Sequence, residues 1–219
     1  MSRTAIAICL VLFLGVSAAN GIIVTIEADD FTPVDIFGPG PPDPQWYSMH
    51  EPAEGIKLWR CDYRTPFENA LSSRYADIFA IASTNLDKPL GDNVIGNPIP
   101  PVADGPVEDW WWDYWSDGPY LLLEVDGLLK DITVHSVTRP GWLVKTFVID
   151  LYAPDGELVG HNFTKGSALT SHLGDYEAKY AMLWTVGARS FDDITVNYIP
   201  EPAMILILGL GFLFIRKIK

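Results

Sequence analysis

Acidic side chains lie beside the first and the last of the segments that have the pattern of β-strands. Glu27, Asp29 and Asp30 stand at the end of the first segment, and Asp192 and Asp193 precede the last one. Where the first and last strands of a β-domain are neighbours, such carboxylates meet and offer the oxygen ligands that Ca²⁺ prefers. The pattern predicts a structural calcium site and requires no other cofactor. The alternative is that these are solvated acids in the turns of an acidic chain.

A second group of side chains with binding chemistry is a run of aromatic rings flanked by acids. Strand side chains alternate between two faces, so these rings cannot all enter one core. Exposed rings stack on the C–H faces of sugars, and nearby carboxylates accept bonds from sugar hydroxyls. The run predicts a carbohydrate-binding surface, and the alternative is that the rings cap the open end of a core. Its members are Trp110, Trp111, Trp112, Tyr114 and Trp115.

No motif in the chain indicates catalysis. The four histidines show neither an HExxH zinc signature nor a close pair, and Ser167, in Lys-Gly-Ser-Ala, lacks the G-x-S-x-G pattern of a nucleophile elbow. Glycoside hydrolysis needs two carboxylates at a defined separation, which a sequence does not reveal. We therefore expect a protein that is not an enzyme, with a polysaccharide-acting enzyme kept as an alternative.

The two ends of the chain have the composition of targeting segments. Arg3, the apolar segment 5–16 and the small residues 17–19 form the three zones of a secretory signal peptide over residues 1–19, which predicts export by the Sec machinery. At the other end, prolines break the fold and a thirteen-residue apolar segment, 203–215, follows. This segment predicts a short transmembrane helix that spans by local thinning of the bilayer, with its basic end in the cytoplasm.

The C-terminal pattern resembles the PEP-CTERM sorting signal of Gram-negative bacteria, which the membrane protease exosortase recognises. The resemblance covers residues 200–219 and implies a brief stay in the inner membrane, then release to the cell surface or the extracellular matrix. It implies exosortase as a partner and an exopolysaccharide matrix as the surroundings. The residues that carry it are Pro200, Glu201, Pro202, Arg216, Lys217 and Lys219.

Composition restricts what the part between these ends can bind. The whole chain has 219 residues and a net charge of −13, and residues 20–199 hold 11 basic and 27 acidic side chains, a net charge of −16. Such a surface repels nucleic acid and other polyanions. Cys61 is the one cysteine outside the signal peptide, so we expect a buried thiol and no internal disulfide.

The middle of the chain has the pattern of an all-β domain over residues 20–199. Short alternating segments separated by proline and glycine predict an antiparallel β-sandwich of the jelly-roll kind. Pro154-Asp155-Gly156 predicts a hairpin turn. One short helix is expected over 66–74, a turn over 167–173 and loops over 31–54 and 85–106. Strands are expected at 22–27, 75–83, 121–125, 132–137, 145–152, 157–161, 180–186 and 194–198, with a turn at Asp126-Gly127.

Two phrases resemble β-sandwich modules that precede PEP-CTERM tails and also carbohydrate-binding jelly rolls. They are the hairpin at 147–160 and the closing segment 191–196. Together these observations predict an exported surface or matrix protein with a non-catalytic structural or interaction role. The alternative is a carbohydrate-binding module that acts on exopolysaccharide.

Overall fold

The computed structural model describes residues 21–33, 49–76, 78–82, 91–96, 120–138, 146–166, 168–172, 177–185 and 189–200. In these ranges every strand pairing is antiparallel, and helix is limited to one short α-helix and one 3-10 turn. The predicted all-β, antiparallel class is confirmed. In the same ranges no helix has the length and apolar character needed to cross a bilayer. The predicted signal peptide and transmembrane helix lie outside the described residues.

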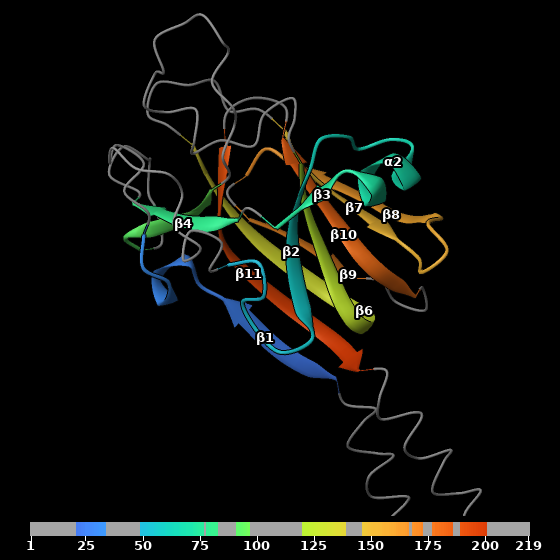
Figure 1. Cartoon of the computed structure of the whole chain (residues 1–219), viewed down its shortest axis with the longest axis horizontal. Helices are drawn as coiled ribbons and strands as arrows, with labels where there is room; N and C mark the ends of the chain where they lie inside the picture. Colours follow the sequence, from blue (N-terminus) through green and yellow to red (C-terminus); the bar gives the residue numbers. More distant parts are fainter. Residues whose placement is uncertain are drawn as a thin grey trace, which may run out of the picture.

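The strands and helices follow one another as Figure 1 shows. Alternating apolar residues and β-branched side chains favour the extended conformation over most of this length. The elements are β1 (Ile22–Ile26), η1 (Ala28–Asp30), β2 (Ile56–Cys61), α2 (Phe67–Ser72), β3 (Arg74–Tyr75), β4 (Phe79–Ala82), β5 (Asn93–Gly96), β6 (Tyr120–Thr138), β7 (Phe147–Tyr152), β8 (Leu158–Thr164), β9 (Ala168–His172), β10 (Ala178–Thr185) and β11 (Arg189–Pro200).

The long strand β6 joins two layers of a sandwich-like sheet (Figure 1). Its first part, up to Val125, pairs with β2 and with most of β10, whose first residue pairs further along at Leu129, and β7 and β8 extend this layer beyond β10. Its second part, from Gly127 on, pairs with β11 and β9. β1 and β5 pair with β11, and β4 pairs with β5. We call the layer of β3, β2, β6, β10, β7 and β8 the front sheet.

The main core lies between the two layers. Inward side chains of β6 alternate along the strand, and Leu121, Leu123, Ile132 and Val134 are all fully buried in one apolar cluster. Burial of each such side chain contributes about 1.5–3 kcal/mol. A shift of register by one residue would turn these side chains away from this core, so the alternation fixes how β6 pairs with its neighbours.

The outer face of the front sheet carries a second apolar cluster, covered by α2. Phe67 of α2 stacks on Tyr152 with ring centroids 4.1 Å apart and tilts against Tyr180 at 5.2 Å. Cys61 is fully buried in this cluster, and burial raises the pKa of its thiol to about 12. The expected buried thiol is confirmed, and the helix expected at 66–74 is present as α2.

The predicted turn at Asp126-Gly127 is wrong, because β6 runs through it as one strand. Gly127 pairs with Pro200 in β11, and a Cβ at Gly127 would lie 2.0 Å from the carbonyl oxygen of Ile199. Glycine permits this close approach where the strand passes from one layer to the other. The signal that resembled a hairpin therefore marks a bend within a strand.

Three other predicted segments differ from the structure. The segment 93–96, expected within a loop, is β5, whose four residues are all buried, and the turn expected over 167–173 contains β9. The strand expected over 75–83 is divided into β3 and β4. In addition, β2 is a strand where none was expected. These strands are short, and β2, β5 and β9 each pair with a strand that is distant in the chain, so local periodicity gives little signal.

The hairpin predicted at Pro154-Asp155-Gly156 is confirmed between β7 and β8. The amide of Gly156 donates to the carbonyl of Ala153 at 3.0 Å, and the amide of Glu157 donates to the Asp155 carboxylate at 3.1 Å. Gly156 has φ of +90°, a conformation that residues with a Cβ rarely adopt. The turn thereby sets β8 opposite β7.

Candidate functional site

The outer face of the front sheet carries a row of side chains set by strand register. Trp59 of β2 lies opposite Leu122 of β6, which lies opposite Met182 of β10. Met182 lies opposite Asp150 of β7, and Asp150 lies opposite His161 of β8. A tryptophan therefore stands at one end of the row and a carboxylate–histidine pair at the other.

Asp150 is a buried carboxylate whose two oxygens are both occupied. Its side chain is 5% exposed, His161 Nδ1 lies 2.6 Å from Oδ1, and Trp184 Nε1 donates to Oδ2 at 2.8 Å. A buried charge needs such partners, because its desolvation is otherwise costly. Asp150 therefore acts as an internal anchor that orients a histidine and a tryptophan.

Arg64 completes this group from the segment between β2 and α2. Its Cζ lies 3.9 Å from the centre of the Trp184 ring, and its Nη1 lies 3.8 Å from Asp150 Oδ2. The guanidinium thus stacks on an aromatic face while remaining 32% exposed. We call Arg64, Trp184, Asp150 and His161 the Arg64 unit.

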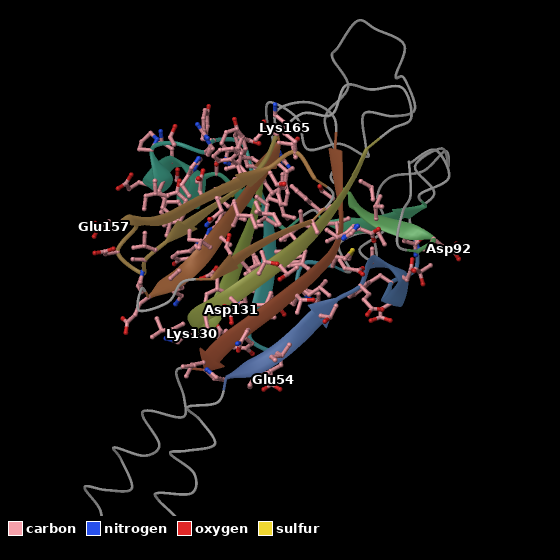
Figure 2. All side chains as sticks on the ribbon, turned by 180° about the vertical axis from the view of Figure 1, so that it is seen from behind. Glu54, Asp92, Lys130, Asp131, Glu157 and Lys165 are labelled. Atoms are coloured by element: carbon pink, nitrogen blue, oxygen red, sulfur yellow. The ribbon has the colours of Figure 1, made fainter. Side chains whose placement is uncertain are left out.

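The exposed side of the Arg64 unit is formed by β8, the edge strand of the front sheet. His161 is 51% exposed, and Phe163 is 65% exposed with its ring centroid 6.1 Å from that of His161. Figure 2 labels Glu157 and Lys165, which flank the two ends of β8. Arginine donors, an imidazole and an exposed ring therefore face solvent together.

A second group of similar composition, with a glutamate in place of the aspartate, lies at the other end of the row. Trp59 Nε1 and Arg74 Nη1 both donate to Glu124 Oε2 at 3.0 Å, and the Arg74 Cζ lies 4.7 Å from the Trp59 ring centre. The His50 ring contacts the Trp59 ring edge-on, with ring centroids 4.2 Å apart, and the His50 Nδ1 lies 2.7 Å from the carbonyl oxygen of Leu58. We call Arg74, Trp59, Glu124 and His50 the Arg74 unit.

Four of the five acidic residues predicted to meet, all except Glu27, interact electrostatically. The pKa of Asp193 is raised by burial first and then by the charge of Asp192, with smaller contributions from Asp29 and Asp30 and an opposing one from His135. Asp29, however, accepts a hydrogen bond from the backbone N–H of Asn93 at 2.7 Å and so ties η1 to β5. Across the described ranges no three His, Cys, Asp or Glu side chains are arranged to hold a metal ion. Calcium binding stays a prediction.

Two other predicted groups fall largely outside the described residues. The aromatic run Trp110–Trp115 lies there entirely, as do Glu201, Pro202 and the basic end of the tail. Pro200 is described and is the last residue of β11. The Pro-Glu-Pro triplet at 200–202 therefore begins where β11 ends.

The Arg64 unit has no compact signature in the sequence, because its members are distant in the chain. Strand register and the segment before α2 assemble residues 64, 150, 161 and 184. One signal was present: Asp150 is a charged residue inside β7, whose six residues are all buried. A carboxylate in such a strand indicates fixed polar partners.

No protein-family model matches the chain, and no curated protein matches it. Solved structures with partial similarity include a Streptococcus pneumoniae fucose binding module, at 8% identity and a TM-score of 0.29, covering 39% of this chain and 67% of that one. The lectin domain of lectinolysin complexed with Lewis B antigen gives 11% identity and a TM-score of 0.26, with coverage of 39% and 67%. Similarity at this level does not establish a common fold or ligand.

Proposed function

We propose that this chain is an exported, non-catalytic β-sandwich module that binds carbohydrate at the Arg64 unit. The observation that carries the proposal is the Arg64 side chain, 32% exposed, whose guanidinium stacks on Trp184 near the buried Asp150. The exposed His161 and Phe163 lie on the same face of the sheet. Binding sites of this kind combine apolar rings with a few polar groups of fixed orientation. Sugars present the matching surfaces, namely C–H faces and hydroxyl groups.

The state of Asp150 supports binding over catalysis. Hydrolysis of a glycosidic bond uses two carboxylates that flank the bond. Asp150 is the carboxylate of the Arg64 unit, and its two oxygens are already bonded to His161 and Trp184. Its role in the proposal is to hold the neighbouring side chains in position.

The experiment is a glycan-binding screen of the purified protein with two matched variants. Arg64→Ala removes the guanidinium of the proposed site, and Arg74→Ala removes the corresponding group of the Arg74 unit. We expect binding to be weakened about tenfold or more by the first change and little by the second. Equal loss in both variants would mean that the two arginines serve only to fasten the segment that contains α2.

We also propose export and sorting through the C-terminal segment that begins at Pro200. Ile22 of β1 pairs with Tyr198 of β11, so the first and last strands of the sandwich are neighbours (Figure 1). Figure 2 places Glu54 near this end of the molecule, and Glu157 and Lys165 away from it. A domain held by a tail after Pro200 would thus present β8 away from the point of attachment.

The sorting proposal is tested by the mass of the protein made in cells that contain an exosortase-type protease. We expect the mature protein to lack residues 1–19 and the apolar segment after the triplet. An intact C-terminus in such cells would contradict sorting and would leave the carbohydrate-binding proposal unaffected.

A further inference from the structure

We infer that the ligand of the Arg64 unit is an uncharged sugar, recognised through neighbouring hydroxyl groups by an arginine donor and a histidine acceptor. This inference rests on the proposed function and adds the chemical class of the ligand. It depends on which hydrogen-bonding atoms of the unit are already used, and on the charge that remains.

The tautomer of His161 follows from its partner. The Asp150 carboxylate is an acceptor, so the 2.6 Å contact with His161 Nδ1 places the hydrogen on Nδ1. In the neutral imidazole the other nitrogen, Nε2, then carries a lone pair and accepts hydrogen bonds. With half of the side chain exposed, an acceptor is available to a ligand at this position.

Arg64 supplies the complementary group. A guanidinium only donates, and the Arg64 Nη1 lies 3.8 Å from Asp150 Oδ2, while His161 is hydrogen-bonded to Oδ1 of the same carboxylate. A donor side chain and an acceptor side chain therefore both lie against a single carboxylate. A sugar hydroxyl both donates and accepts, so two adjacent hydroxyls match this pair, whereas a carboxylate or sulfate offers only acceptors.

Charge favours the same class of ligand. The positive charge of Arg64 is opposed by the buried Asp150 at 3.8 Å, so the unit with a neutral His161 has no net charge. The domain around it is acidic, with 27 acidic and 11 basic side chains over residues 20–199. A polyanion is repelled by such a domain, and an uncharged polymer is not. The exposed Phe163 provides the apolar surface for the C–H face of the ring.

The test compares uncharged and acidic polysaccharides as probes for the full-length exported protein. Dextran, galactomannan and xyloglucan represent the first class, and alginate and hyaluronan the second. Binding is measured by affinity electrophoresis and calorimetry at about 0.05 M and about 0.5 M NaCl, because salt screens ionic contacts and leaves uncharged ones nearly unchanged. We expect binding to at least one uncharged polymer at both salt concentrations.

Three variants separate the acceptor of His161 from its charge. His161→Gln keeps a neutral acceptor, and His161→Lys replaces it with a cation that only donates. His50→Lys adds the same charge at the Arg74 unit and is the matched control. We expect uncharged-polymer binding to fall about tenfold in His161→Lys, and to change less than about threefold in His161→Gln and His50→Lys. Thermal unfolding of each variant shows that the fold is retained.

The uncharged-sugar inference would be overturned if the protein bound alginate or hyaluronan, lost this binding at high salt, bound more tightly as His161→Lys and required Arg64. That result would keep the carbohydrate-binding proposal. An increase in affinity for the uncharged polymers in His161→Lys would also overturn it. Absence of binding to both classes would overturn the inference and the proposed function together.

Discussion

Asp150 organises the site at the scale of single residues. It is nearly buried, and it bonds His161 and Trp184 while opposing the charge of Arg64. Removal of a buried acceptor leaves its donors unpaired, which costs more than the bond itself contributes. The same carboxylate thus stabilises the fold of β7, β8 and β10 and sets the orientation of the side chains that we propose bind a ligand.

Asp150→Ala should therefore destabilise the protein more than Glu124→Ala does. Glu124 has the equivalent place in the Arg74 unit, but its side chain is 15% exposed where that of Asp150 is 5% exposed. Water can replace Glu124 more readily, so we expect a loss of about 2–3 kcal/mol for Asp150→Ala and about 1 kcal/mol for Glu124→Ala. Urea unfolding measures both. A loss in Asp150→Ala no larger than in Glu124→Ala would contradict the anchoring role.

Asp193→Asn should stabilise the protein at neutral pH. Burial, and then the charge of Asp192, raises the pKa of Asp193 in the folded state. An acid with a raised folded pKa binds more protons in the folded than in the unfolded state, so its contribution to stability falls as pH rises through the window between the two values. Above that window the folded protein bears the full destabilisation caused by the charged Asp193 carboxylate.

The side-chain amide that Asp193→Asn introduces carries no charge, so this cost disappears in the variant. Thermal unfolding from acidic to neutral pH should show a higher midpoint for Asp193→Asn near neutrality and convergence with the parent protein in acid. A lower midpoint at neutral pH, together with stabilisation by added calcium in the parent protein alone, would instead support the predicted calcium site.

At the scale of elements, one connecting segment shapes the outer face of the front sheet. The segment from β2 to β3 carries Arg64, then α2, then Arg74, and each arginine stacks on a tryptophan of the sheet. Phe67 fixes the middle of the segment on Tyr152 and Tyr180. The position of the guanidinium at the proposed site therefore depends on the packing of a six-residue helix.

Gly156→Ala should destabilise the β7–β8 hairpin and the packing of α2 together. The residue has φ of +90°, and an added Cβ would lie 3.2 Å from Phe67 Cδ1. We expect a loss of about 1–2 kcal/mol, measured by urea unfolding, and faster hydrogen exchange in α2. Gly166→Ala is the control, because its φ lies outside the left-handed region and its nearest neighbour would be the Thr164 hydroxyl. Equal losses in the two variants would contradict this account of the turn.

The elements show what the sequence could predict. Alternation and the Pro-Asp-Gly turn identified β7 and β8, since both signals are local. The bend of β6 at Gly127 could not be told from a turn, because glycine beside a polar residue is typical of both. The Arg64 unit could not be found at all, because its residues become neighbours only through the pairing of β10, β7 and β8.

At the scale of the whole molecule, the proposed point of attachment and the proposed binding site lie in different parts of the domain. β1 and β11 pair along one side, and the sheet ends at Pro200, where the proline triplet begins. β7 and β8 belong to the front sheet, and the main core separates them from the β1–β11 pair (Figure 1). Their outer face points away from this core. An acidic domain with one binding face turned away from its tether would suit a protein that contacts an uncharged polymer at the cell surface.

The most direct test of the central claim is the NMR signal of the tryptophan indole N–H groups during titration with the uncharged polymer that binds best. Trp184→Phe and Trp59→Phe identify the two relevant signals. We predict that the Trp184 signal shifts with saturation as ligand is added and that the Trp59 signal stays in place, because Trp184 underlies Arg64 and Trp59 belongs to the Arg74 unit. An unchanged Trp184 signal, with shifts confined to Trp59 or to the run Trp110–Trp115, would contradict the claim that the Arg64 unit binds carbohydrate.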